Sequence, residues 1–339
     1  MHLGRQYKTT DFLAWTRWEI GWIISWSILV TLFLEVSGWS FLTVPGPILT
    51  IVGSALAISL AFKNQQCYAR FNDGLTLSGQ VSTASLVLAN RLMATIDNRD
   101  AAPEPGLREI FYRHFAWLTA LRFYLREKRS WENTYDRGNV SFLARLPSPE
   151  SQSVLEDELR PYLSDAELQK FKVHRGDKEA LLLQWQYEAI KDIHSRSLIS
   201  EFIFTGLAGA LDELLRLQGG LKRVKNYPYS RNYYSIAVIV VKIFAAIVPF
   251  SLFPYARELG EPAGIAAWTA WLNVPLSAIV GWIFVSMEKV GENSSNPFEG
   301  NANDVPISSI TRRIEIEMRV MLGEQTELKP IEAKDSILF

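Results

Sequence analysis

The residues best placed to do chemistry in this chain lie in an apolar segment, where Ser54, Ile58 and Phe62 recur at a spacing of four and continue to Gln66. This spacing puts them on one face of a helix. A ring of such helices, one from each subunit of an oligomer, would form a narrow apolar neck that can gate by dewetting. The positive edge of a phenylalanine ring would favour an anion there. The same spacing is also typical of ordinary helix packing, and the pattern alone leaves both interpretations open.

Two charged residues, Glu35 and Lys242, fall inside apolar sequence. A charge in lipid costs about 3 kcal/mol or more unless it faces protein, water or a partner. One interpretation is that these residues line an ion route or pair with each other. The alternative is that the lysine extends to the interface and that Glu35 lies at the outer interface near Trp39.

The sequence contains no recognisable motif of an enzyme, a metal centre or a nucleic-acid-binding protein. A nucleophile elbow, a phosphate-binding glycine loop and a catalytic pair of carboxylates are all missing, so we do not expect an enzyme. The single cysteine, Cys67, and the four histidines show no ligand spacing, so no metal or other cofactor is expected. A net charge of −1 gives no reason to expect nucleic acid as a partner.

Four apolar blocks must position the residues named above. Each is long enough to cross a hydrocarbon core of about 30 Å. The predicted spans cover approximately residues 20–42, 48–62, 233–253 and 263–287. Short connectors, SGWSFLTVPGP and ARELGEP, make each successive pair a hairpin.

Basic residues flank the four spans mainly on one side. The two tight connectors contain only Arg257. The longer segments contain Arg5, Lys8, Arg17, Lys63, Arg70, Arg223, Lys225, Arg231 and Lys289. The positive-inside rule therefore predicts a multi-pass protein of the cell inner or plasma membrane, with both termini and the middle region in the cytoplasm.

The middle region is charged and shows helical periodicity, for example over residues 107–127 and 178–218, without strand-like alternation. The predicted fold class is therefore an all-α membrane protein with four transmembrane helices and a cytosolic helical domain. We expect residues 1–62 to form the N-terminal segment and the first two spans. Residues 63–230 should form the cytosolic domain, 231–287 the last two spans, and 288–339 a cytosolic C-terminal segment.

Three motifs in this chain resemble those of the bestrophin family of chloride channels in its bacterial form. After the second span, LAFKNQQCYARFND resembles the run G-F-R-N-N-x-x-Y-x-R-F-x-E. Before the third span, ALDELLRLQGGLKRVKNYPYSRNYY resembles a segment that ends in T-P-I-P-x-x-Y. After the fourth span, NPFEGNANDVPI resembles P-F-G-x-x-x-N-D-L-P-L. Order, spacing and predicted topology agree over nearly the whole chain.

The resemblance implies a homopentamer around one central pore, with long helices reaching into the cytoplasm. The family's three neck positions fall on Ser54, Ile58 and Phe62, and its lower cytosolic aperture falls near Thr205. Bulky apolar residues are usual at the first neck position and at the aperture, whereas Ser54 and Thr205 are small and hydroxylated. These departures should weaken dewetting and argue against a tightly closed resting state.

The resemblance also bears on calcium. Animal members hold calcium with an acidic run after the fourth span, but the corresponding stretch here is KVGENSSNPFEG. It offers too few carboxylates for the six to eight oxygen ligands that calcium takes. Calcium gating is therefore not expected.

The expected function is passive conduction of chloride or other small anions, with the lipid bilayer and further copies of the chain as partners. The sign of the conducted ion is not determined by an apolar neck. Lys63, directly after Phe62, would favour anions if it faces the pore, but it could instead pair with a carboxylate at the membrane surface. A ring of Asp73, Asp212 or Glu213 would favour cations.

Other classes of function remain as alternatives. A cation-permeable homologue would share every motif described above. A non-conducting membrane scaffold or sensor would use the cytosolic helices to bind partners. A secondary transporter is less favoured, because four spans without an inverted repeat lack that architecture, although Pro249 and Pro275 could break helices.

Overall fold

The structure is a computed structural model that describes residues 1–95, 105–133 and 136–339. Over these residues it is helical, and its β contacts are isolated bridges of His2 and of Lys334 with Ile337. The all-helical architecture agrees with the predicted fold class. The helices are α1 (Thr9–Trp15), α2 (Arg17–Ser37), η1 (Ser40–Leu42), α3 (Gly46–Met93), α4 (Pro105–Arg126), α5 (Arg137–Arg145), η2 (Pro149–Ser151), α6 (Leu155–Leu159), α7 (Asp165–Val173), α8 (Lys178–Ser195), α9 (Glu201–Asn226), α10 (Arg231–Glu258), η3 (Glu261–Ala263), α11 (Ala266–Thr269), η4 (Ala270–Leu272), α12 (Asn273–Asn293) and α13 (Ile307–Met321).

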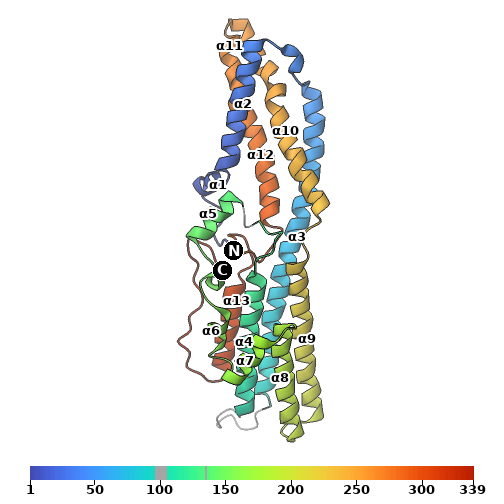
Figure 1. Ribbon diagram of the computed structural model, residues 1–339, viewed down its shortest axis with the longest axis vertical. Coiled ribbons are helices and arrows are strands. Elements are labelled where there is room, and N and C mark those ends of the chain that lie inside the picture. Colours follow the sequence, from blue (N-terminus) through green and yellow to red (C-terminus); the bar gives the residue numbers. More distant parts are fainter. Residues whose placement is uncertain (96–104, 134–135) are drawn as a thin grey trace.

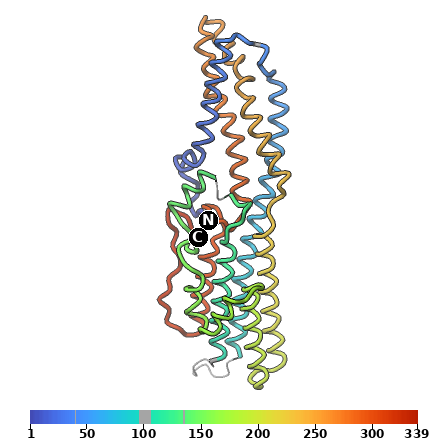
Figure 2. Tube along the Cα trace, in the orientation of Figure 1, coloured from blue at the N-terminus to red at the C-terminus, as the bar shows by residue number. Residues whose placement is uncertain are grey.

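The molecule is elongated and consists of two helical bundles that share one continuous helix (Figures 1 and 2). The first bundle, here called the span bundle, contains α2, α10, α12 and the first half of α3. The second, the lower bundle, contains α4, α8, α9, α13 and the second half of α3. The largest hydrophobic core lies in the lower bundle, around the fully buried rings of Trp117, Phe111 and Phe115.

Four helical segments are long and apolar enough to cross a membrane, and each overlaps one predicted span. They cover Arg17–Ser37, Gly46–Met93, Glu201–Ala263 and Ala266–Asn293. The first ends five residues before the predicted position 42, at Ser37. Gly38, with a φ of 64°, closes α2 in the left-handed conformation that favours glycine.

Helix α3 continues far beyond the predicted second span. It runs without a break for 48 residues, from Gly46 to Met93, which corresponds to about 72 Å at 1.5 Å per residue. The predicted domain boundary between residues 62 and 63 therefore falls inside a single helix. One rigid element connects the membrane-spanning part of the chain to the lower bundle.

Two other stretches, each predicted as one continuous segment, are divided into separate helices in the structure. The periodic segment 178–218 contains two helices, α8 and α9, with Ser200 capping α9 by accepting a hydrogen bond from the Ile203 amide. The start of the fourth predicted span is divided into η3, α11 and η4 before the long helix α12 begins at Asn273. Pro275 lies in the first turn of α12, where a missing amide hydrogen disrupts no helical bond.

Helix α10 contains Pro249 and Pro254 in its interior. Each proline removes an amide hydrogen, which leaves carbonyl groups without their usual helical donor. In lipid such groups must be satisfied by neighbouring protein. The carbonyl of Phe250, four residues before Pro254, accepts instead from the Val44 amide at 3.4 Å. Two neighbouring carbonyls accept bonds from other helices as well: Ala246 accepts from Trp26 Nε1 at 2.9 Å and Pro249 from the Asn273 side-chain amide at 3.0 Å. These bonds connect α10 to α2, α12 and the segment that leads into α3.

The two ends of the chain lie side by side between the bundles (Figure 1). The Leu338 amide donates to the Met1 carbonyl at 2.9 Å, and the Ser309 amide donates to the Phe339 carbonyl at 2.7 Å. Ile337 and Phe339 are buried in a small cluster with Leu146. The termini are thus part of the folded structure at the level where the bundles meet.

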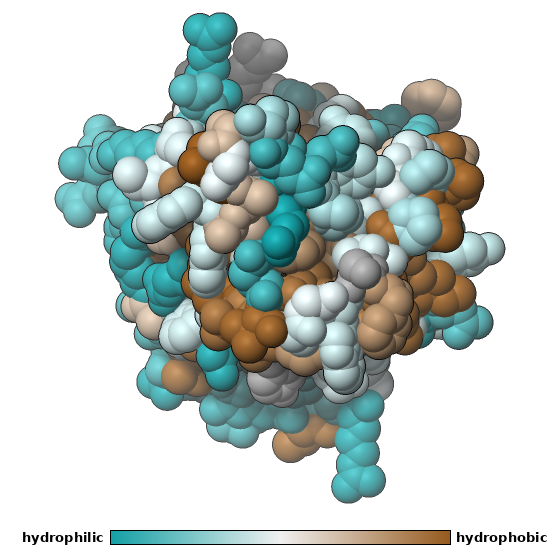
Figure 3. Space-filling view, turned by 90° about the horizontal axis from the view of Figure 1, so that it is seen from above, coloured by the Kyte–Doolittle hydropathy of each residue, from teal (hydrophilic) through white to brown (hydrophobic). Residues whose placement is uncertain are grey.

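Large apolar side chains remain exposed over the span bundle of the single chain, including Val36, Ile51, Ile239 and Ile279. The view onto the α11 end shows exposed hydrophobic side chains beside hydrophilic ones (Figure 3). A soluble monomer rarely exposes so much contiguous apolar surface. Lipid or other subunits must cover this surface, which agrees with a multi-pass membrane protein.

Asn273→Ala should destabilise the span bundle by about 1–2 kcal/mol. Asn273 is fully buried and donates to both Thr31 Oγ1 and the Pro249 carbonyl, so its loss removes two buried hydrogen bonds that join α12 to α2 and α10. Thermal unfolding in detergent measures the effect. Ser25→Ala is the control, because exposed Ser25 bonds only to Gly21 of its own helix; equal shifts in both variants would contradict this account of α10.

Candidate functional site

Helix α3 has two opposite faces with different surroundings. At membrane depth, one face is buried and carries Gly53, Leu56, Leu60, Lys63 and Cys67. The opposite face is exposed and carries Ser54, Ile58, Phe62 and Gln66. Both sets recur at spacings of three or four, as the helical period requires. The residues predicted to form a neck therefore share one face, and that face is exposed in the part of the chain that the structure describes.

The buried face packs closely on α10. Leu56 and Leu60 belong to a hydrophobic cluster with Val241, Phe244 and other residues of that helix. Gly53 allows the approach, since a Cβ there would lie 3.1 Å from the Phe244 ring. Small residues of this kind let two helices approach closely in a membrane.

Lys63 lies on the buried face and therefore does not point in the same direction as Phe62. Its Nζ is 2.5 Å from Glu288 Oε1, and its side chain is 3% exposed. The ammonium also lies 4.9 Å from the centre of the Tyr234 ring. From the sequence, Lys63 could either face the pore or pair with a carboxylate. In the structure it forms the ion pair, which joins α3 to α12 beside α10.

Two turns after Lys63, Arg70 brings the three sequence motifs together. Its Nε donates to the Ser295 carbonyl at 2.7 Å, and its Nη2 donates to the Val224 carbonyl. Arg70 belongs to the first motif, Val224 to the second, and Ser295 immediately precedes the third. Spacing along the chain gave no indication of this meeting point, because the three segments are more than 70 residues apart.

The apolar side chains on the exposed face of α3 are accessible from outside the single chain. Ile58 is 59% exposed and Phe62 is 64% exposed, whereas Leu60 between them is fully buried. Such exposure of two large side chains is unfavourable in water. At this depth the face must meet lipid, another subunit or a pore.

The two intramembrane charges do not pair with each other. Glu35 Oε2 lies 2.8 Å from Arg257 Nη1, so the carboxylate pairs with the one basic residue of the connectors. Lys242 is exposed on α10 and has no ion pair within the described part of the chain. Glu35 therefore lies at the end of the span bundle near α11, as expected of an interfacial glutamate, while the role of Lys242 stays open.

Thr205 lies at the other end of the molecule, in the first turns of α9. It is exposed, and its hydroxyl donates back to the Glu201 carbonyl at 3.0 Å. The guanidinium of Arg91, near the end of α3, donates to the carbonyl of Gly206, the residue after Thr205. A positive charge is thus fixed beside the predicted lower aperture.

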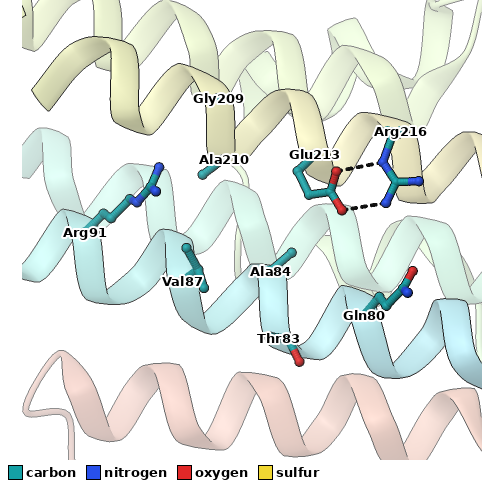
Figure 4. Close-up of a pocket in the computed structure, with 9 residues that line it drawn as sticks. All are labelled: Gln80, Thr83, Ala84, Val87, Arg91, Gly209, Ala210, Glu213 and Arg216. Carbon is teal, nitrogen blue, oxygen red and sulfur yellow. Dashed lines mark hydrogen bonds and ion pairs between the residues drawn. The ribbon is translucent and has the colours of Figure 1, made fainter. Parts of the chain in front are cut away.

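Arg91 closes one end of a groove between α3 and α9 (Figure 4). Toward the other end, Arg216 forms a bidentate ion pair with Glu213, with distances of 2.7 and 2.6 Å. The charge of Glu213 is therefore balanced within its own helix. Arg91 has no carboxylate partner among the residues that the structure describes.

Sequence reasoning missed Arg91, although a signal for it existed. Positions 62 and 91 are 29 residues apart (91 − 62 = 29), which is close to eight turns of 3.6 residues. Arg91 therefore shares the direction of Phe62 on one straight helix. Arg91 could be placed on this face only if α3 continues past its membrane-spanning part, whereas the sequence predicted a boundary at residue 62.

The third motif forms a loop with two buried carboxylates, Glu299 and Asp304. Glu299 accepts hydrogen bonds from the Asn296 and Asn301 side chains, both at 2.6 Å, and Asp304 accepts from the Gly300 amide at 2.6 Å. Burial, reinforced by the nearby Asp304, raises the pKa of Glu299 to about 8. Within the described ranges no group of three or more His, Cys, Asp or Glu residues is arranged to hold a metal, and independence from calcium stays a prediction.

Known proteins resemble this chain over most of its length. Residues 17–320 match the family described as Bacterial/Fungal Bestrophin protein. The chain is 24% identical over 312 residues to the Voltage-dependent anion channel-forming protein YneE of Salmonella typhi, covering 91% of this chain and 87% of that protein. It is 23% identical over 275 residues to the Voltage-dependent anion channel-forming protein RSc3414 of Ralstonia nicotianae, covering 81% of this chain and 76% of that one.

Solved structures share the fold. A crystal structure of a bacterial bestrophin homologue from Klebsiella pneumoniae superposes with a TM-score of 0.73 at 20% identity, covering 91% of this chain and 99% of that one. A crystal structure of a membrane protein with a P262A substitution gives a TM-score of 0.74 at 19% identity, covering 92% and 100%. At these identities the likeness establishes the architecture.

Lys63→Met should destabilise the chain by about 3 kcal/mol, because it leaves Glu288 as a buried charge without its partner. The double variant Lys63→Met/Glu288→Met should recover most of that loss, since both charges are then gone. Unfolding in detergent measures both effects. Arg216→Gln, which opens a solvent-exposed ion pair, is the control and should leave the stability almost unchanged. A double variant as unstable as Lys63→Met would contradict the ion-pair explanation.

Relative to the variant Glu299→Gln, the wild type should lose stability as the pH rises from about 5 to about 8, through the titration of Glu299. The comparison with the variant isolates this carboxyl from the Met1 amine and His114, whose lowered pKa values act in the opposite direction. Because the pKa of Glu299 in the folded chain is about 8 rather than 4.5, the folded state binds more protons than the unfolded state in this window. The difference in thermal midpoint between the wild type and Glu299→Gln, measured against pH, should show the decline. Glu317→Gln, at an exposed position of α13, is the control; an unchanged slope in Glu299→Gln would exclude this carboxyl as the cause.

Proposed function

The chain belongs to the bacterial and fungal bestrophin family, and on that premise we propose that it is an ion channel that conducts chloride or other small anions passively. The proposed assembly is a homopentamer in the cell inner membrane, with both termini and the lower bundle in the cytoplasm. Five copies of α3 surround the pore. Relatives named as voltage-dependent anion channel-forming proteins support the class of function.

The observation that carries the proposal is the exposed apolar face of α3. Ile58 and Phe62 are unpacked in a helix whose opposite face is tightly packed and pinned by a buried ion pair. Turned toward a central axis, Ser54, Ile58 and Phe62 would form a neck without fixed charge. Lys63 takes no part in that neck, because its side chain lies on the buried face and pairs with Glu288.

At two positions the proposed pore should restrict water and ions less than a large apolar residue would. Ser54 at the top of the neck and Thr205 at the lower aperture carry small hydroxylated side chains, which water wets more readily than large apolar ones. Dewetting would then depend on Ile58 and Phe62 alone. We therefore propose a channel that conducts at rest, without calcium as a gating ligand.

The preference for anions is assigned to Arg91. Five copies would place five guanidinium groups beside the aperture at Thr205, each held by the Gly206 carbonyl. Of the carboxylates that could favour cations, Glu213 is balanced by Arg216. Asp212 lies seven residues from Thr205, about 10 Å along α9, which is about the screening length at physiological salt.

Glu201 is an opposing charge on the same helix as Thr205. It lies one turn beyond Thr205, its side chain is 77% exposed, and it is 2.9 Å from His194. Solvent screens an exposed carboxylate of this kind strongly. Arg91 is held at the residue next to Thr205, so it should determine the sign. If the charge of Glu201 determined the sign of the conducted ion instead, the chain would have the alternative function of a cation-permeable homologue.

Recording from the purified protein in a planar bilayer under a salt gradient tests both conduction and sign. The wild-type reversal potential should indicate anion preference. Arg91→Gln should reduce the ratio of anion to cation permeability roughly fivefold, as expected for the loss of about 1 kcal/mol of attraction. Glu201→Gln should shift the ratio in the opposite direction. The double variant Glu213→Gln/Arg216→Gln, which removes a balanced pair, should leave it unchanged.

Several outcomes would contradict the proposal. Pentamers without conductance would exclude a channel. If ion flux stayed at the background level in the wild type and in Ile58→Ala and Phe62→Ala alike, a scaffold or sensor would be favoured. Saturable, coupled uptake in liposomes would indicate a secondary transporter. Conductance with an unchanged reversal potential in Arg91→Gln would keep the channel but remove Arg91 from ion selection.

A further inference from the structure

Helix α2 carries a continuous exposed apolar stripe on the outside of the span bundle. Its members recur at spacings of three, four or seven and are Trp18, Trp22, Leu29, Leu32 and Val36. The opposite face, with Ile23, Ser27, Val30 and Leu34, is buried. From Trp18 to Val36 the stripe is about 27 Å long, close to the thickness of the hydrocarbon core. It has the length and polarity of a surface that lies along lipid tails.

The stripe ends at two guanidinium groups from different elements. Arg17 of α2 lies with its Cζ 5.7 Å from the centre of the Trp18 ring, and Arg137 of α5 lies 4.9 Å from it. Contacts of this kind hold an arginine beside an aromatic ring. Neither arginine forms an ion pair in the part of the chain that the structure describes. Two positive charges therefore flank the tryptophan at the level of the membrane surface.

The carboxylates next to these arginines are directed elsewhere. Glu19 and Asp136 both pair with buried Lys289, at 2.8 and 3.2 Å. Asp136 also caps α5 through hydrogen bonds from the Gly138 and Asn139 amides. These contacts hold α5 against the start of α2 and leave Arg17 and Arg137 to face outward. The outward surface is positive where the apolar stripe ends.

We propose that this surface, formed by Arg17, Trp18 and Arg137, binds one anionic phospholipid from the leaflet on the side of the lower bundle. The acyl chains lie along the stripe of α2, and the phosphodiester lies between the two guanidinium groups. Arginine suits this ligand because its planar fork donates two hydrogen bonds to phosphate oxygens. Tryptophan at the end of a span is typical of the headgroup level. The site is remote from the exposed face of α3 and does not depend on ion conduction.

The test titrates dioleoylphosphatidylglycerol or dioleoylphosphatidylcholine into delipidated full-length protein in detergent and follows the thermal midpoint. Phosphatidylglycerol should raise the midpoint at lower concentration than phosphatidylcholine. In Arg17→Gln/Arg137→Gln the apparent affinity for phosphatidylglycerol should fall roughly 30-fold, as expected from the loss of two basic groups at an anionic membrane surface. Lys172→Gln/Arg175→Gln removes the same charge from exposed positions at the end of α7 and in the loop that follows. That control should bind like the wild type.

Two further measurements complete the experiment. Helix content by circular dichroism should be unchanged in the double variant, since both arginines are at the surface, and inorganic phosphate at the same concentration should not raise the midpoint. Equal stabilisation by both lipids, or unchanged selectivity in Arg17→Gln/Arg137→Gln, would overturn the proposal. A change in oligomer mass by light scattering in that variant would also overturn it, because the surface would then be a contact between subunits.

Discussion

The buried ion pair between Lys63 and Glu288 determines how helix α3 is oriented. A charged amine that is 3% exposed is stable only beside an opposite charge. This requirement fixes the rotation of α3 about its own axis, because any other rotation would turn Lys63 away from its partner. With that side fixed, Phe62, about 100° away around the helix axis, lies on the exposed face and points out of the bundle. The exposure of the apolar face thus follows from the position of one lysine.

The same logic of paired and unpaired charges runs through the whole chain. Glu35 is balanced by Arg257, and Lys289 engages both Glu19 and Asp136. What remains unbalanced stands out against this background. Arg91 remains at the end of the α3 groove, and Arg17 and Arg137 remain beside Trp18. At these two places, beside the groove and beside the tryptophan, an anion is the natural partner of the unpaired cations.

Much of the fold could be predicted from the sequence, because a segment that crosses the hydrocarbon core must be a long apolar helix. Four long apolar blocks with basic flanks indicate four spans, and the structure contains four matching helical segments. Positions 54, 58 and 62 were placed on one face correctly, since only the helical period matters. The end of the first span was misjudged, because Gly38 stops the helix inside sequence that is still apolar.

What could not be predicted depends on contacts between distant segments. The direction of Lys63 is decided by Glu288, which lies 225 positions away along the chain. The convergence of Arg70, Val224 and Ser295 depends on the packing of three helices, which leaves no trace in local spacing. Arg91 required knowledge that α3 continues through residue 93. Local periodicity specifies faces, whereas tertiary contacts specify what each face meets.

The uninterrupted length of α3 also has a mechanical consequence. The helix is anchored at Lys63, and from there Ser54 lies about 13 Å in one direction while Arg91 lies about 42 Å in the other, at 1.5 Å per residue. A stiff rod that tilts about such a pivot moves its two arms in opposite directions and in proportion to their lengths. Any tilt of α3 would therefore displace Arg91 about three times as far as Ser54. The helix acts as an unequal lever, in which a small movement in the membrane becomes a large one at the far end of the lower bundle.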